Sequence, residues 1–158
     1  MRVIYGMKGP YYIAVGEEEL FVTEDYHYTV LNIQGQRVLT IGSKGKPPFG
    51  DEYPLGITTD SDGSVYITTE DHKVQKFSRC GELVKTVGKR GLNAGEFNWL
   101  FDIRYHNHKV YVCDSGNGRV EVFDCNLNFI RSFGTRGDGP GQLKKPRDID
   151  FDAQGTLT

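Results

Sequence analysis

Short apolar runs, separated by polar turns rich in glycine, asparagine and aspartate, fill the sequence from end to end. The stretch from 101 to 133 shows the pattern in full, with runs at 101–105, 110–113, 119–123 and 129–133. Runs of this length that are rich in β-branched and aromatic residues are typical of β-strands. No segment carries the sustained apolar period of a helix. The pattern therefore predicts an all-β protein.

The strand pattern recurs at a fixed spacing. Gly42, Gly88 and Gly134 each open a glycine, any residue, basic residue, glycine motif, and they follow one another at steps of 46 residues. The same step relates three isoleucines, at positions 57, 103 and 149. Four antiparallel strands in a repeat of about this length form one blade of a β-propeller.

The repeat divides the chain into blades. Whole blades are predicted at 10–42, 55–88 and 101–134, with the outer strand of a preceding blade at 1–6 and the start of a further blade at 146–158. The second strand of each blade, such as 65–67, is apolar at successive positions, as expected for a strand covered on both faces. The chain is thus predicted to hold about three and a half blades.

An incomplete ring would leave an unpaired strand edge and an uncovered blade face. We therefore expect the chain to be a piece of a longer protein and to self-associate through this face when isolated. Closure of one ring by two copies is the alternative.

Composition indicates the class of protein and its cellular compartment. The 158 residues are 37% hydrophobic and 25% charged, as in globular proteins, and the formal net charge of −2 gives no overall reason to expect a nucleic-acid or membrane partner. Three cysteines without paired spacing favour a reducing compartment. No apolar run reaches the length of a bilayer span, and the N-terminus does not resemble a signal peptide. A cytoplasmic protein is predicted.

The distribution of charge is more informative than its sum. The loops between blades carry an excess of lysine and arginine, while the hairpin turns at the opposite end are acidic. Phe101 and Arg147 occupy equivalent positions beside the mouth of the central channel, and aromatic and guanidinium planes stack on RNA bases. The candidate ligand-binding residues are Lys44, Lys89, Arg90, Phe101, Arg119, Arg136, Lys145 and Arg147. The alternatives are that the basic loops are solvated turns, that Phe101 is a packing residue, and that Arg119 pairs with Asp114 or Asp102.

Two segments carry a family resemblance. The segment 114–123, Asp-Ser-Gly-Asn-Gly-Arg-Val-Glu-Val-Phe, resembles the hallmark of the NHL repeat, and 137–155 is similar to the segment that opens the next NHL blade. The resemblance implies a ring of about six blades. It also implies kinship with the C-terminal propellers of TRIM-NHL proteins, in which a RING domain transfers ubiquitin and the propeller selects a protein or an RNA. The expected partner is therefore a protein substrate or a single-stranded or structured RNA.

Enzymatic chemistry is not predicted for this chain. The RING pattern of cysteines and histidines is absent, no nucleophile motif is present, and His106 and His108 lack a third metal ligand. We therefore predict no catalytic residue, metal or cofactor. A metal-dependent lyase or hydrolase propeller and a plain interaction scaffold are the alternatives.

Overall fold

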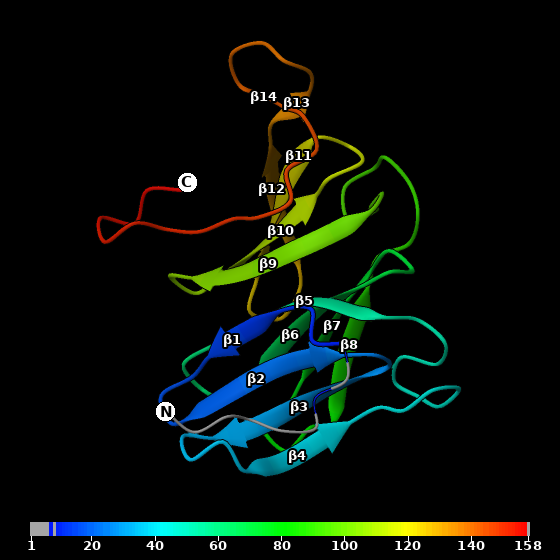
Figure 1. The fold of residues 1–158 in the computed structure, drawn as a ribbon. Coiled ribbons are helices and arrows are strands. Elements are labelled where there is room, and N and C mark those ends of the chain that lie inside the picture. The colour runs from blue at the N-terminus through cyan, green and yellow to red at the C-terminus, as the bar shows by residue number, and fades with distance from the viewer. Residues whose placement is uncertain (1–6, 8, 158) are drawn as a thin grey trace.

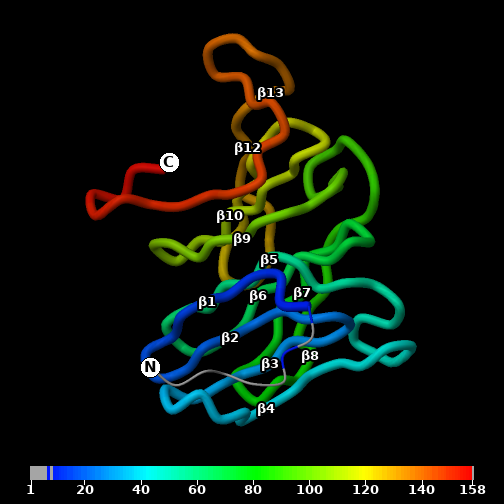
Figure 2. The backbone as a smooth tube through the Cα atoms, viewed as in Figure 1, coloured from blue at the N-terminus to red at the C-terminus, as the bar shows by residue number. Residues whose placement is uncertain are grey.

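The computed structural model describes residues 7 and 9–157. Within this part the regular structure consists of strands and contains no helix, so the all-β prediction is confirmed. Three four-stranded antiparallel sheets stand one beside the next (Figures 1 and 2). The outer strand predicted at 1–6 lies outside the described residues.

Each sheet is a meander whose strands pair in chain order. The first blade contains β1 (Ile13–Val15), β2 (Glu19–Glu24), β3 (His27–Asn32) and β4 (Arg37–Ile41). The second contains β5 (Pro54–Thr59), β6 (Val65–Thr69), β7 (Lys73–Phe77) and β8 (Leu83–Val87). The third contains β9 (Leu100–His106), β10 (Lys109–Asp114), β11 (Arg119–Asp124) and β12 (Phe129–Phe133). The short strands β13 (Thr135–Arg136) and β14 (Gln142–Leu143) form a parallel pair.

The core lies between blades rather than inside any one of them. One apolar cluster joins Tyr28 of the first blade to Phe77 of the second, and another joins Tyr66 of the second blade to Phe123 of the third. Strand β6, between its two neighbouring blades, is buried at every position. This explains the successive apolar residues at 65–67, because a strand covered on both faces has no solvent side.

The two outer blade faces differ. On the third blade, Ile149, Phe151 and Leu157 pack against the sheet, and the Phe151 ring stacks on His106 at a centroid distance of 4.1 Å. Residues 146–157 form no named strand, and one bridge joins Phe151 to Leu157, so a further blade here stays a prediction. On the first blade, Ile13 and Val15 are 55% and 75% exposed. Self-association through an open blade face also stays a prediction.

A buried tyrosine fastens the second blade to the third. The hydroxyl of the fully buried Tyr66 lies 2.9 Å from both the Asp60 carboxylate and the Cys125 carbonyl oxygen. Replacing Tyr66 with phenylalanine removes both hydrogen bonds and should lower the free energy of unfolding by about 1–2 kcal/mol, although the Cys125 carbonyl oxygen still accepts from Lys76 Nζ. Urea denaturation measures the change. Tyr105→Phe is the control, since the Tyr105 side chain is only partly buried and its hydroxyl meets His108 at the surface, and an equal loss in both variants would contradict the assignment.

Candidate functional site

The innermost strands of the blades lie side by side, with β5 between β1 and β9 (Figure 1). Where these strands begin, two positions recur in each repeat at a spacing of 46 residues, and the fold places them close together. These positions hold Tyr53 and Leu55, then Trp99 and Phe101, then Lys145 and Arg147. The side chains change from aromatic and aliphatic to basic from one repeat to the next, and two pockets open between them.

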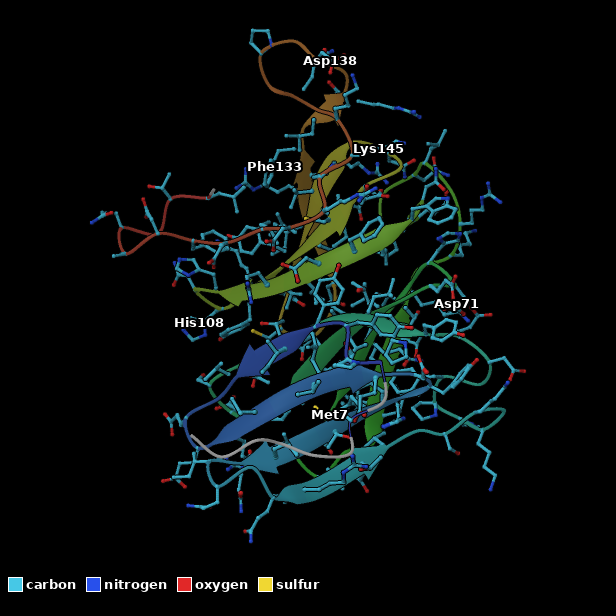
Figure 3. The ribbon with its side chains drawn as sticks, viewed as in Figure 1. Met7, Asp71, His108, Phe133, Asp138 and Lys145 are labelled. Atoms are coloured by element: carbon cyan, nitrogen blue, oxygen red, sulfur yellow. The ribbon has the colours of Figure 1, made fainter. Side chains whose placement is uncertain are left out.

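The first of these, the basic pocket, has a volume of about 350 Å³ and lies between the third blade and the segment that follows it. It is lined by Asn98, Trp99, Phe101, Ser115, Gly116, Arg136, Lys145 and Arg147. The guanidinium carbon of Arg147 lies 5.3 Å from the centre of the Phe101 ring, a cation–π contact. Figure 3 places Lys145 and Asp138 on the side of the interblade loops and His108 at the opposite end of the third blade. Four of the eight predicted residues thus meet here.

The second, the aromatic pocket, has a volume of about 440 Å³ and lies between the second and third blades. It is lined by Tyr11, Tyr53, Leu55, Glu70, Trp99, Leu100 and Phe101. Trp99 and Phe101 line both pockets, so one aromatic wall separates them. The two pockets form a continuous surface at the channel mouth.

Trp99 is held in place by its backbone. Its φ angle of 56° lies in the left-handed region, which is unusual for a bulky residue. The Trp99 amide donates to His72 Nδ1 at 3.2 Å, and its carbonyl oxygen accepts from the Ser115 amide at 3.2 Å. The side chain is left 61% exposed. Strained backbone that is pinned from two sides is a common feature of binding sites.

Arg119 lies beneath this surface and belongs to the scaffold. Its Nε is 2.8 Å from Asp114 and its Nη2 is 2.8 Å from Glu121, both of which are fully buried carboxylates. The same guanidinium donates to the carbonyl oxygens of Leu92, Asn93 and Glu96. The structure therefore places Arg119 in the ion pair with Asp114 that the sequence left open, where it holds the loop leading to Trp99.

The other three predicted residues lie outside both pockets. Lys44 Nζ lies over the Tyr26 ring at 5.3 Å. Lys89 pairs with Glu96 at 3.1 Å, and a backbone hydrogen bond from Asn93 together with Lys89 lowers the pKa of that carboxylate. Arg90 is exposed on the same loop. These three residues can meet a ligand only beyond the pockets.

A carboxyl pair lies just inside the mouth. Asp102 is 3% exposed, and burial together with a hydrogen bond to Asp148 raises its pKa to about 7. The Ile149 amide lies 3.3 Å from Asp102 Oδ2 and 2.9 Å from Asp148 Oδ1. The pair therefore ties the start of the final segment to the third blade.

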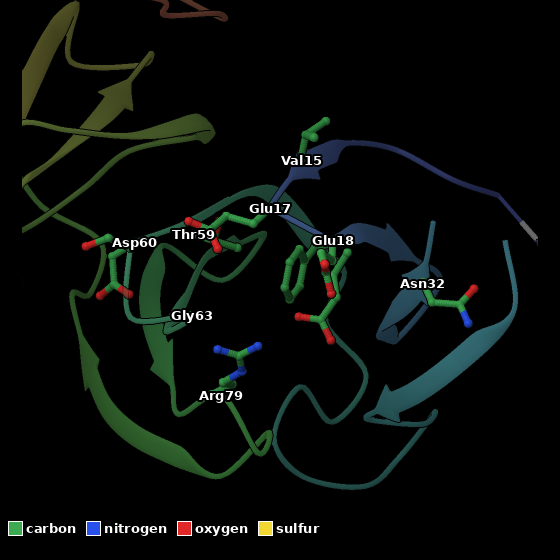
Figure 4. A pocket seen from close by; sticks show the side chains of 12 residues that line it. Val15, Glu17, Glu18, Asn32, Thr59, Asp60, Gly63 and Arg79 are labelled. Atoms are coloured by element: carbon green, nitrogen blue, oxygen red, sulfur yellow. The ribbon is translucent and has the colours of Figure 1, made fainter. Parts of the chain in front are cut away.

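A third pocket, which we call the acidic pocket, opens on the opposite face at the hairpin turns of the first two blades (Figure 4). Its volume is about 540 Å³, and its charged lining consists of Glu17, Glu18, Glu19, Asp60 and Arg79. Its excess of acids contrasts with the basic pocket. Within residues 9–157, no three histidine, cysteine, aspartate or glutamate side chains gather as metal ligands. The described chain also contains no helix able to cross a membrane.

Sequence reasoning missed the aromatic half of the site. Tyr11, Tyr53 and Trp99 were not among the predicted residues, although the repeat contained the signal that would have found two of them. Moving back from Lys145 by one and two steps of 46 residues leads to Trp99 and Tyr53. These two positions lie two residues before Phe101 and Leu55, the positions that the same step relates to Arg147.

No protein-family profile matches the chain. Among curated proteins, the RING finger protein nhl-1 of Caenorhabditis elegans is 46% identical over 57 residues, which are 35% of this chain and 6% of that protein. This partial match supports the NHL-like character of the repeat.

Solved structures show the fold. The hydrazine synthase of Kuenenia stuttgartiensis matches 99% of this chain and 43% of its own with a TM-score of 0.72 and 17% identity. Virginiamycin B lyase from Staphylococcus aureus matches 90% of this chain and 45% of its own with a TM-score of 0.65 and 19% identity. A Bacteroides caccae protein of unknown function matches 92% of this chain and 50% of its own, with a TM-score of 0.61 and 12% identity. The chain thus spans half or less of these structures, and the prediction of β-propeller blades is confirmed.

Proposed function

We propose that this chain is a non-catalytic recognition module that binds a protein or RNA segment across the channel mouth. The observation that carries the proposal is the meeting of three basic side chains with two aromatic rings in the basic pocket. Arg136, Lys145 and Arg147 come from two separate stretches of the chain, and all three are exposed. Such a pocket is the usual form of a ligand site.

The chemistry of the basic pocket defines what it selects. Guanidinium and ammonium groups bind carboxylates and phosphates through charge-assisted hydrogen bonds. The Phe101 and Trp99 rings beside them offer flat apolar surfaces for a base or an aromatic side chain. The ligand is therefore a segment that places an anionic group next to a flat or apolar one.

The match to a RING finger protein supports a place for this module in a larger ubiquitin ligase. In that role the propeller selects the substrate and a separate domain carries out ubiquitin transfer. Two of the similar structures are named as enzymes, but identities of 17% and 19% relate them to this chain through the fold alone. Metal analysis of the purified chain tests the enzyme alternative, because a stoichiometric bound metal would favour it.

A salt series tests the recognition proposal. For a labelled single-stranded RNA, replacing both Lys145 and Arg147 with glutamine should weaken binding and flatten the plot of log affinity against log salt by about 0.7 per lost phosphate contact. For an acidic peptide, the same double variant should also weaken binding. Fluorescence anisotropy measures both. Arg79→Gln in the acidic pocket is the matched control, and equal affinities in all three proteins would contradict the proposal.

A further inference from the structure

We infer that the aromatic pocket binds the basic side chain of a protein segment whose acidic neighbour occupies the basic pocket. This inference rests on the proposed function and adds the class of partner. The two pockets share the Trp99 and Phe101 wall but are opposite in character. One presents three cations, and the other presents aromatic faces, with Glu70 as the only charged side chain among the described residues that line it.

The aromatic pocket has the features of a cation site. Tyr11 and Tyr53 meet edge to face at 6.0 Å, and the Tyr53 ring lies 4.8 Å from that of Tyr26. Tyr11 and Trp99 are 47% and 61% exposed, so their rings are open to a ligand. An ammonium or guanidinium group is attracted to the negative face of an aromatic ring, and the Glu70 carboxylate adds a full negative charge at the same place.

Two contacts within the chain already use this attraction. Lys44 Nζ lies 5.3 Å from the centre of the Tyr26 ring, which packs on Tyr53. Arg147 makes the corresponding contact with Phe101 on the basic side. Cations thus lie over the Tyr26 and Phe101 rings, while the described residues that line the aromatic pocket include no cation.

Two carboxylates, those of Asp25 and Glu70, lie at the aromatic pocket. The Tyr11 hydroxyl donates to Asp25 at 2.9 Å, and that hydrogen bond, followed by burial and by nearby negative charge to which Glu70 contributes least, raises the pKa of Tyr11 to about 12. A nucleic-acid backbone that followed the whole mouth would have to pass these two carboxylates. A peptide with charges of both signs meets complementary charge in each pocket, so the geometry favours a protein over an RNA.

A peptide series tests the inference, with the fluorescence of Trp99 as the readout because it is the only tryptophan in the sequence. The probe is a capped peptide with one lysine and one aspartate separated by two glycines. Replacing its lysine with norleucine should raise the Kd by about 2- to 30-fold, the range expected for a cation on an aromatic face. Replacing its aspartate with asparagine should weaken binding through the basic pocket.

Two variants of the chain locate the effect. In Glu70→Gln, the preference for lysine over norleucine should shrink, while the preference for aspartate over asparagine stays. Tyr53→Leu should also reduce the lysine preference, and urea denaturation shows whether that variant remains folded. For a uridine decanucleotide, Glu70→Gln should tighten binding, because it removes a repelling charge. The inference therefore predicts opposite signs for peptide and RNA.

The outcomes separate the two proposals. If the lysine and norleucine peptides bind equally while the aspartate preference persists and depends on Arg147, the further inference fails and the proposed function stands. If RNA binds far more tightly than any peptide and Glu70→Gln leaves that affinity unchanged, the partner is an RNA and the inference also fails. If neither the peptide nor the RNA binds, both the further inference and the proposed function fail.

Discussion

Replacing Arg119 with methionine should lower the free energy of unfolding by about 3–5 kcal/mol, the usual cost of removing one partner of a buried ion pair. The variant leaves the carboxyl groups of Asp114 and Glu121 buried without the guanidinium that pairs with them. Methionine fills most of the space of the arginine stem, so lost packing contributes little. The loss therefore reports on charge and hydrogen bonding.

Urea denaturation followed by circular dichroism measures this loss. Arg90→Met is the matched control, because Arg90 is exposed on the same interblade loop and a surface change of this kind stays within about 0.5 kcal/mol. Equal stability of the two variants would show that Arg119 is not an anchor.

The same substitution should also disturb the candidate site. Arg119 holds three carbonyl oxygens of the loop 92–96, and this loop leads directly to Trp99. Releasing the loop weakens the restraint on the left-handed backbone of Trp99. We therefore expect a change in tryptophan fluorescence in folded Arg119→Met that Arg90→Met does not show.

The fold was predictable because every repeat must satisfy the same packing and turn requirements. Each blade needs a doubly covered strand such as β6 and glycines that turn sharply between blades. A side chain at Gly88 would clash with the Phe97 ring, and its φ angle is 101°. Such positions recur at a fixed step, so a single sequence reveals them without knowledge of packing.

The site was predictable only in part. Arg147 and Phe101 were found because their place beside the channel follows from the repeat alone. The role of Arg119 depends on which carboxylates the fold brings to it, and three of its acceptors are backbone carbonyls that no side-chain pattern marks. The exposure of Trp99 depends on a backbone conformation imposed from a distance by His72 and Ser115, which the sequence does not display.

The carboxyl pair at the mouth should make the stability of the chain depend on pH. Asp102 has a pKa of about 7 when folded, because it is buried and hydrogen bonded to Asp148, whereas an unfolded aspartate has a pKa of about 3.9. Between these values the folded state binds the extra proton, so the free energy of unfolding falls as the pH rises. The stabilisation is complete below about pH 4 and is lost as the pH passes through about 7.

Replacing Asp102 with asparagine should remove this dependence, because the amide keeps a hydrogen-bond donor for Asp148 at every pH. Between pH 5 and pH 8 the free energy of unfolding of the wild-type protein should fall by about 2–3 kcal/mol more than that of Asp102→Asn. The variant should be the more stable protein at pH 8. Burial also raises the pKa of Glu121 to about 7, and that share of the pH dependence is present in both proteins and cancels in the comparison. Urea denaturation at pH 5, 6, 7 and 8 measures the difference. Parallel curves for the two proteins would show that Asp102 is already ionised in the folded chain, and the start of the final segment would then be held by the Ile149 amide without a shared proton.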